Sequence, residues 1–294
     1  MGELAYVNGT YCPIEEAVVS IEDRGFQFGD GIYEVIAVYN GRPFQLDGHL
    51  RRLERSAEMI ALDLDVEAMR IEPIVIEGVR RSGLTDVYVY IQITRGCAPR
   101  AHAVPEGLSP TVVMTFKPLV PLSIDVREKG IAVMTTPDLR WRNCCVKAIT
   151  LLPNVLAKSE AVRRGYDDAL FVSDDGHVRE ATSGNVFTVR DSVIHTPPRD
   201  ERVLHGITQG FIMACAEAIG LRFVETHLPL DEMMQADEVF VSSTAVEVLG
   251  VRSIDDKPVA GGKVGPVTTR LHRAFQDGVR RNTAPSIQQK SASA

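Results

Sequence analysis

The stretch KPLVPLSID, residues 117–125, decides how the fold is organised because it divides the chain in two. It contains Pro118 and Pro121, and proline cannot donate a backbone hydrogen bond to a sheet, so the run of strands before it ends here. We therefore predict a domain boundary within this stretch. A small N-terminal domain would span residues 1–119 and a larger domain residues 120–281.

The segments before the boundary alternate between strand and helix patterns. The Asn8-Gly9 and Asn40-Gly41 pairs are typical of tight hairpin turns. Spacing of apolar residues predicts a helix in 46–62, with Leu50, Leu53, Ala57 and Ile60 on one face, and another in 66–83, with Pro73 near its first turn and Gly83 as its stop. Strands are expected in 31–44, 87–96 and 111–120.

The segments after the boundary continue the mixture, so the fold class is α+β. Glycine brackets the clearest helix, GITQGFIMACAEAIG at 206–220, and a second helix is expected near 154–165. Strands are expected in 131–136, 169–180, 185–196 and 238–254. The polar tail NTAPSIQQKSASA, residues 282–294, is expected to be disordered.

The composition narrows the class of protein. The 294-residue chain is 45% hydrophobic with a net charge of -7, whereas a domain that binds a nucleic acid duplex normally presents a basic face. No apolar run approaches the roughly 20 residues of a membrane span, and the N-terminus has no signal-peptide pattern. The five cysteines show no metal-ligand spacing. We expect a cytoplasmic protein with reduced thiols, no metal and no nucleic-acid or membrane partner.

Two basic side chains stand close together in TRGCAPRAH, residues 94–102. Arg100 and His102 follow a predicted strand, and side chains two apart on an extended backbone point the same way. They could face one acidic ligand together, or only water.

Lys147 lies among apolar residues in NCCVKAITLLP, and the nearest acids in sequence are Asp138 and Glu160. An apolar setting without a local carboxylate lowers a lysine pKa, and a neutral amine can attack a carbonyl to form a Schiff base. The alternative is a lysine whose stem packs at a strand edge while its amine reaches water.

Three other segments have the chemistry of a phosphopyridine site. Gly206, Ile207 and Thr208 open a helix, where free N–H groups favour a phosphate, and the polar run Ser242, Ser243 and Thr244 offers hydroxyls. Glu180 ends a strand and, if buried, needs a cationic or proton-sharing partner such as a pyridine nitrogen. Each feature also has a simpler explanation: helix capping, a solvated turn and a surface glutamate. Together with Lys147 they match the needs of pyridoxal 5'-phosphate.

The chain resembles the class IV, fold-type IV pyridoxal-phosphate aminotransferases, and within them the D-amino-acid transaminases. The resemblance runs from Tyr6 to about Gly278 and is carried by several motifs in family order: EDRGFQFGDGIYEV at 22–35, HLRRL at 49–53, TRGCAPRAH at 94–102, CCVKAITLLPNVLAK at 144–158, EATSGNVF at 180–187, LHGIT at 204–208 and VSSTAVE at 241–247. It implies two domains, the larger with a β-barrel-like core, and a homodimer with shared active sites.

The resemblance also implies roles for individual residues. Lys147 resembles the Schiff-base lysine, and Glu180 matches the carboxylate that pairs with the pyridine nitrogen. The phosphate would be held by Arg52, Ile207, Thr208, Thr244 and Ser243. Tyr33, Arg100 and His102 would bind the substrate α-carboxylate, with the last two supplied by the neighbouring subunit. The implied reaction is transamination of D-amino acids such as D-alanine with 2-oxoglutarate, giving pyruvate and D-glutamate.

Three positions depart from the family pattern: Gln209 for a common arginine, Ala245 for a hydroxyl residue and Phe26 for a frequent tyrosine. Branched-chain L-aminotransferases and aminodeoxychorismate lyases share the cofactor motifs but lack the Arg100–His102 pair. A relative that binds the cofactor without turnover is the remaining alternative.

Overall fold

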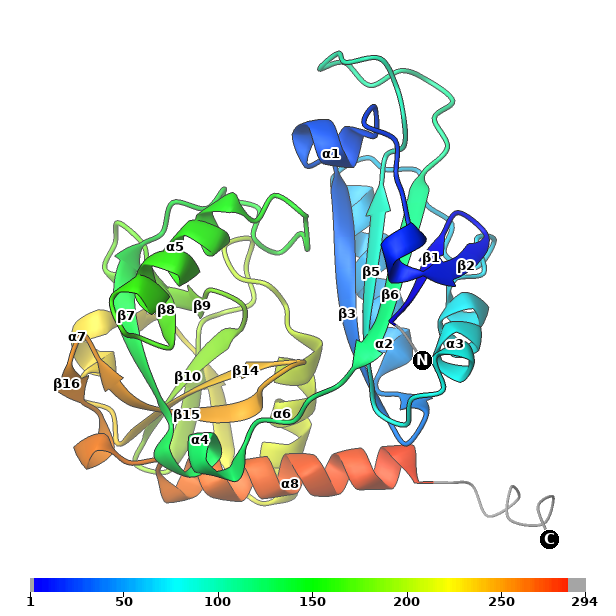
Figure 1. Cartoon of the computed structure of the whole chain (residues 1–294). Helices are drawn as coiled ribbons and strands as arrows, with labels where there is room; N and C mark the ends of the chain where they lie inside the picture. Colours follow the sequence, from blue (N-terminus) through cyan, green and yellow to red (C-terminus); the bar gives the residue numbers. More distant parts are fainter. Residues whose placement is uncertain (1–2, 285–294) are drawn as a thin grey trace, which may run out of the picture.

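The computed structural model describes residues 3–284, which form two β-sheets with helices packed on them (Figure 1). The first sheet has six strands in the order β2-β1-β6-β5-β3-β4, all antiparallel. Its strands are β1 (Leu4–Val7), β2 (Thr10–Pro13), β3 (Gly31–Tyr39), β4 (Arg42–Pro43), β5 (Val87–Thr94) and β6 (Thr111–Pro118). Helices α2 (Leu46–Met59) and α3 (Ile71–Ser82) cover one face and bury its apolar side chains.

The two Asn-Gly pairs form the predicted hairpin turns. Asn8 and Gly9 have φ of 44° and 100°, and Asn40 and Gly41 have φ of 53° and 72°. Consecutive positive φ values are the requirement of tight two-residue hairpins, and Asn and Gly tolerate them best. These turns set the register of β1 on β2 and of β3 on β4.

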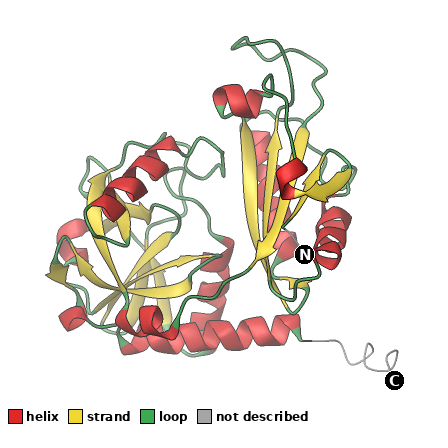
Figure 2. Ribbon diagram, viewed as in Figure 1, coloured by secondary structure: helices red, strands yellow, loops and turns green. Residues whose placement is uncertain are grey.

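The second sheet is mixed and curls on itself (Figure 2), as expected for a barrel-like core. Its main order is β12-β11-β10-β14-β15-β7-β8-β9-β13, with β16 beside β15. The strands are β7 (Ile131–Pro137), β8 (Asp168–Val172), β9 (His177–Ala181), β10 (Asn185–Arg190), β11 (Val193–Thr196), β12 (Arg222–Glu225), β13 (Leu228–Pro229), β14 (Glu238–Ser243), β15 (Glu247–Ile254) and β16 (Lys257–Pro258). The helices are α4 (Ile124–Lys129), α5 (Leu152–Arg163), α6 (Ile207–Ala218), α7 (Leu230–Met233) and α8 (Pro266–Thr283).

Residues 119–123 connect the two sheets, and direct contacts bring them together elsewhere. The ring of Phe44, after β4, lies 4.8 Å from that of Phe211 on α6 and 5.9 Å from that of Phe275 on α8. The Tyr39 hydroxyl donates to Glu247 on β15 over 3.2 Å. These contacts hold the C-terminal end of β3 against the second sheet.

Several sequence expectations need correction. Residues 66–70 form turns, and α3 begins only at Ile71. Helix α8 includes Asn282 and Thr283, which were expected to be disordered; both side chains donate to carbonyls one turn earlier, at Gly278 and Val279. Residues 285–294 of that expected tail lie outside the described residues. No helix within residues 3–284 is long and apolar enough to cross a membrane.

Candidate active site

A cavity of about 230 Å³ lies where the two sheets meet. Eight of the ten predicted site residues line it: Tyr33, Arg52, Lys147, Glu180, Ile207, Thr208, Ser243 and Thr244. They come from β3, α2, the β7–α5 connection, β9, the start of α6 and the β14–β15 turn. Residues far apart in the sequence therefore converge on one pocket.

Backbone hydrogen bonds to β3 fix the segment that holds Lys147. The Tyr33 amide donates to the Lys147 carbonyl over 2.9 Å, and the Ile149 amide donates to Gly31 over 3.1 Å. The Lys147 amide donates to the Ser56 hydroxyl of α2 over 3.2 Å. Lys147 is thus attached to the first sheet although it follows β7 of the second.

The Lys147 amine points over the Tyr33 ring, with Nζ 4.1 Å from the ring centroid. Burial, aided by the Arg52 charge, lowers the pKa of Lys147 to about 8, although Glu34 and Glu180 oppose that shift. The sequence showed no carboxylate near Lys147, but the fold brings these two into electrostatic range. The amine is nevertheless neutral far more often than that of an ordinary lysine.

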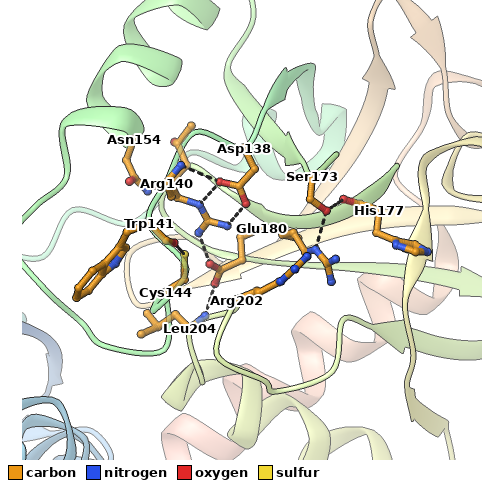
Figure 3. A network of polar contacts seen from close by, with 12 residues as sticks. Asp138, Arg140, Trp141, Cys144, Asn154, Ser173, His177, Glu180, Arg202 and Leu204 are labelled. Atoms are coloured by element: carbon orange, nitrogen blue, oxygen red, sulfur yellow. Dashed lines mark hydrogen bonds and ion pairs between the residues drawn. The ribbon is translucent and has the colours of Figure 1, made fainter. Parts of the chain in front are cut away.

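Glu180 is buried at the end of β9, so the surface interpretation is wrong. One oxygen, Oε2, accepts a hydrogen bond from Arg140, while Oε1 accepts from the Leu204 amide over 2.9 Å (Figure 3). Oε1 also accepts from the Asn185 side chain over 3.3 Å. Burial raises the pKa of Glu180, and the charge of Arg140 opposes this only in part. Three donors leave one of the roughly four lone-pair sites of a carboxylate available to a ligand.

Arg140 is a site residue that the sequence did not reveal. It lines the cavity and also donates to Asp138 over 2.8 Å. Burial lowers the pKa of Arg140, but hydrogen bonding to Asp138 and the charge of Glu180 outweigh it and raise the value. The ion pair joins residues 40 apart in sequence, so no local pattern could have predicted it.

Arg52 is paired with a carboxylate that the sequence analysis missed. Its Nε and Nη2 donate to Glu34 over 2.6 and 2.7 Å, and its Nη1 donates to the His205 carbonyl over 3.0 Å. His49 shares Glu34 at 2.7 Å. Three of the five N–H groups of the guanidinium are thus used and two remain. Glu34 was detectable, because it shares a strand face with the fully buried Ile32 and Ile36.

The wall of the cavity also offers hydrogen-bond donors to an anion. Ile207 and Thr208 are the first residues of α6, where backbone N–H groups have no partner within the helix. The Ser242 hydroxyl is fully buried, lines the cavity and has no hydrogen-bond partner among the described residues. A buried hydroxyl without a partner is costly unless a ligand completes it. A phosphate fits these donors, with Arg52 as the cation.

The three departures lie in different places. Ala245 lines the cavity. Gln209 instead turns inward, is fully buried, and accepts from the Gly206 amide over 3.3 Å at the start of α6. Phe26 is 73% exposed on α1 (Arg24–Phe28). Only Ala245 therefore changes the cavity wall directly.

Arg100 and His102 are absent from the lining of this cavity. They lie on the exposed connection between β5 and β6, whose backbone bends here and is not extended as expected. Both nevertheless face one side chain: the Arg100 guanidinium lies 4.7 Å, and the His102 ring 5.7 Å, from the Phe28 ring centroid. Figure 1 draws this loop at the outer end of the first sheet, beyond α1.

A lysine of lowered pKa, a buried carboxylate with one open site and a set of donors suited to a phosphate together fit the pocket of a pyridoxal-phosphate enzyme. Residues 31–254 match the model of the family amino-transferase class IV, and the chain belongs to that family. It is an aminotransferase, and its cofactor is pyridoxal 5'-phosphate.

Curated relatives extend over nearly the whole chain. A D-alanine aminotransferase of Bacillus licheniformis is 38% identical over 280 residues, covering 95% of this chain and 98% of the relative. One from Staphylococcus haemolyticus is 39% identical over 270 residues, covering 92% and 95%.

Solved structures with the same fold include branched-chain amino acid aminotransferases. The one from Escherichia coli has a TM-score of 0.86 at 28% identity and covers 98% of this chain and 97% of its own. The T.th. enzyme with pyridoxamine 5'-phosphate has a TM-score of 0.88 at 27% identity, covering 97% and 96%. The fold of this chain is therefore that of fold-type IV aminotransferases.

Proposed function

We propose that this aminotransferase transfers the amino group of D-amino acids such as D-alanine to 2-oxoglutarate, giving pyruvate and D-glutamate. The observation that carries the proposal is the Arg100–His102 pair. Both side chains lie on an exposed loop, and both approach the Phe28 ring of α1. Such a pair suits an α-carboxylate, because Arg can bind it through two parallel hydrogen bonds. Similarity to D-alanine aminotransferases at 38% and 39% identity supports the same assignment.

The proposal includes a homodimer, in which the loop of one subunit reaches the cavity of its partner. Its own cavity does not include Arg100 or His102. Large apolar side chains near the cavity are exposed in the single chain, namely Leu139, Trp141, Leu152, Val155 and Leu156. Exposed apolar side chains that gather along one stretch of chain, here 139–156, suit a protein contact.

The residues of the cavity then divide the work. Pyridoxal phosphate supplies an aldehyde for an amine and a ring that accepts electrons from the substrate Cα. Lys147 would bind the aldehyde carbon of the cofactor. It would also remove the proton from the substrate Cα and deliver it to that same cofactor carbon. Glu180, positioned by Arg140, would keep a proton on the ring nitrogen. Ile207, Thr208, Ser243, Thr244 and Arg52 would hold the phosphate, and Tyr33 would stand beside the substrate.

The two domains would have separate tasks in this scheme. Residues 1–119 would supply the substrate side and the dimer contacts, and residues 120–281 would bind the cofactor, with Arg52 of the first domain reaching its phosphate. A cytoplasmic location stays a prediction.

The competing function is that of a branched-chain L-aminotransferase, since the structural neighbours at 27–28% identity are branched-chain amino acid aminotransferases. Purified protein loaded with pyridoxal phosphate should be given 2-oxoglutarate with either D-alanine or L-leucine. We expect pyruvate from D-alanine and little product from L-leucine. Activity with L-leucine alone would overturn the proposal, and bleaching of the cofactor without amino transfer would indicate a lyase.

A further inference from the structure

A buried arginine of α1 contacts the part of the loop that holds Arg100 and His102, in addition to backbone hydrogen bonds that join Gly96 to Arg24 and Ala98 to Glu22. Arg24, only 4% exposed, lies at the start of α1. Its Nη1 donates to the Ala101 carbonyl over 2.7 Å, and its Nη2 donates to the His102 carbonyl over 3.3 Å. Ala101 lies between Arg100 and His102 in sequence, and the second carbonyl belongs to His102 itself.

Arg24 is itself fixed by a carboxylate. Its Nε donates to Asp30 over 2.8 Å, and Asp30 also accepts from the Nε of Arg95 over 2.9 Å. Burial raises the pKa of Asp30, but hydrogen bonds and charges from Arg95 and Arg24 outweigh it and lower the value. Asp30 therefore stays ionised at neutral pH and orients the Arg24 fork toward the loop.

The aromatic ring of α1 completes the arrangement. The Arg24 guanidinium lies 4.9 Å from the Phe28 ring centroid, and Arg100 lies 4.7 Å from the same centroid. The Arg24 side chain thus contacts the loop backbone directly, and it contacts the Phe28 ring that Arg100 and His102 also approach. Arg24 need not contact a ligand to affect binding, because it would act on the conformation of the loop that holds Arg100 and His102.

We propose that Arg24, oriented by Asp30, is a positioning residue that holds the 99–102 backbone in the conformation where Arg100 and His102 can take a substrate carboxylate together. This inference rests on the proposed function of that pair. A binding residue whose competent conformation is populated only part of the time has its affinity reduced by that fraction. Loss of Arg24 should therefore weaken substrate binding and leave the chemistry at Lys147 intact.

The first test compares Arg24→Met and Arg24→Lys with wild type in steady-state transfer from D-alanine. Arg24→Met should raise KM about tenfold, equal to about 1.4 kcal/mol, with kcat changed less than about twofold. Arg24→Lys keeps the ion pair with Asp30 but loses the forked donor, so its KM should lie between those of wild type and Arg24→Met. If Arg24→Met does not fold, the KM of Arg24→Lys alone tests the inference. A fall in kcat with unchanged KM in the soluble variants would overturn the inference.

A matched control is Arg95→Lys. Arg95 is also buried and paired with Asp30, but its remaining N–H groups donate to Ile60 and Ala61 and not to the loop. Its KM for D-alanine should stay within about twofold of wild type, because the loop contacts remain. An equal rise in KM for Arg95→Lys and Arg24→Lys would assign the effect to the shared ion pair and contradict a specific role for Arg24.

The double variant separates this inference from the function it rests on. If Arg24 acts through Arg100 and His102, then adding Arg24→Met to Arg100→Met should raise KM by much less than Arg24→Met does in wild type, because only the His102 contact remains to be lost. If Arg100→Met leaves KM unchanged, the proposed carboxylate site itself is wrong. If Arg100→Met is impaired while Arg24→Met is normal, or if the two effects multiply, only the positioning role fails.

A readout independent of activity is hydrogen exchange of the peptide 97–108. Its amides should exchange faster in Arg24→Lys than in wild type or Arg95→Lys, because the loop opens more often. Unchanged exchange in Arg24→Lys would mean that Arg24 does not hold the loop, whatever its effect on KM.

Discussion

Lys147 and Tyr33 meet across the cavity, with the lysine Nζ 4.1 Å from the centroid of the tyrosine ring. A tyrosine ring attracts an ammonium, which would favour the charged lysine. The opposite result is found, because burial and the Arg52 charge lower the pKa of Lys147 to about 8. Burial also raises the pKa of Tyr33 to about 12, so the phenol stays neutral beside the amine. The site therefore holds a lysine that can act as a nucleophile near neutral pH.

This lowered pKa predicts how cofactor loading depends on pH. Only the neutral amine attacks an aldehyde, so the rate at which cofactor-free protein takes up pyridoxal phosphate should rise with pH and level off above about pH 8. At pH 7 roughly a tenth of the Lys147 amines would be neutral, against about one in 2,500 for an ordinary lysine. Stopped-flow absorbance at several pH values measures this. A rate that keeps rising toward pH 10 would contradict the lowered value.

Replacement of Lys147 should remove the covalent link to the cofactor. After borohydride reduction, Lys147→Ala should show no cofactor-sized increase in mass, whereas wild type should show one. The control is Lys158→Ala, which removes a half-exposed lysine on α5 and should keep the increase. Bound colour alone is ambiguous, since the phosphate donors remain. An adduct on another lysine in Lys147→Ala would refute the assignment.

Glu180→Gln should slow amino transfer strongly without preventing cofactor attachment. The amide keeps the shape of the side chain but loses the negative charge that would hold a proton on the ring nitrogen. Loss of a preorganised charge at a reacting centre typically costs roughly 100-fold. Single-turnover rates with D-alanine test this.

Glu238→Gln is the matched control for Glu180→Gln. Glu238 is likewise a buried carboxylate in the second sheet, but it accepts from the Val267 and Thr268 amides at the start of α8, outside the cavity. Its single-turnover rate should stay near that of wild type. An unchanged rate in Glu180→Gln would refute the proposed role of Glu180.

Glu34→Gln should destabilise the protein, because it leaves the buried Arg52 guanidinium without its carboxylate. Breaking a buried pair from one side costs about 3–5 kcal/mol. The paired charges of Arg52 and His49 lower the pKa of Glu34 despite its burial, so this stabilisation is present above the pKa of an unfolded glutamate and is lost as pH falls. Urea unfolding at pH 7 and pH 4 should show a difference between wild type and variant that shrinks at the lower pH.

The control for Glu34→Gln is Glu77→Gln on the exposed side of α3, where Glu77 pairs with Arg80 and Arg81. Exposed pairs are screened by solvent and contribute little. Its unfolding midpoint should stay close to that of wild type. An equal loss of unfolding free energy in both variants would mean that the buried Glu34–Arg52 pair stabilises the protein no more than an exposed pair does.

Local features of the fold could be predicted from the sequence. The Asn8-Gly9 and Asn40-Gly41 turns were found because their backbone conformation depends on the two residues themselves. Helix α8 was missed although its apolar residues Leu271, Phe275 and Val279 have helical spacing. Helix α1 has only five residues, and its Asp23 cap is too weak a signal alone.

The sequence predicted most residues of the cavity wall but not the ion pairs that hold them, and the reason is physical. The residues of its wall were found from short motifs, but their partners were not, because each ion pair joins separate elements. Glu34 meets Arg52 across 18 residues and Arg140 meets Glu180 across 40. Such pairs depend on how the sheets assemble, which no local pattern records.

In the proposed homodimer, each active site would combine Lys147 of one subunit with Arg100 of the other. Arg100→Met alone should lower kcat/KM for D-alanine by roughly 10- to 150-fold, the value of one charge-assisted hydrogen bond. Equal amounts of Arg100→Met and Lys147→Ala protein should then be mixed, with subunit exchange verified by mass. Each mixed dimer would hold one site with both groups intact, so activity should recover toward roughly one quarter of wild type for random exchange of a symmetric dimer. No recovery after verified exchange would contradict a shared site.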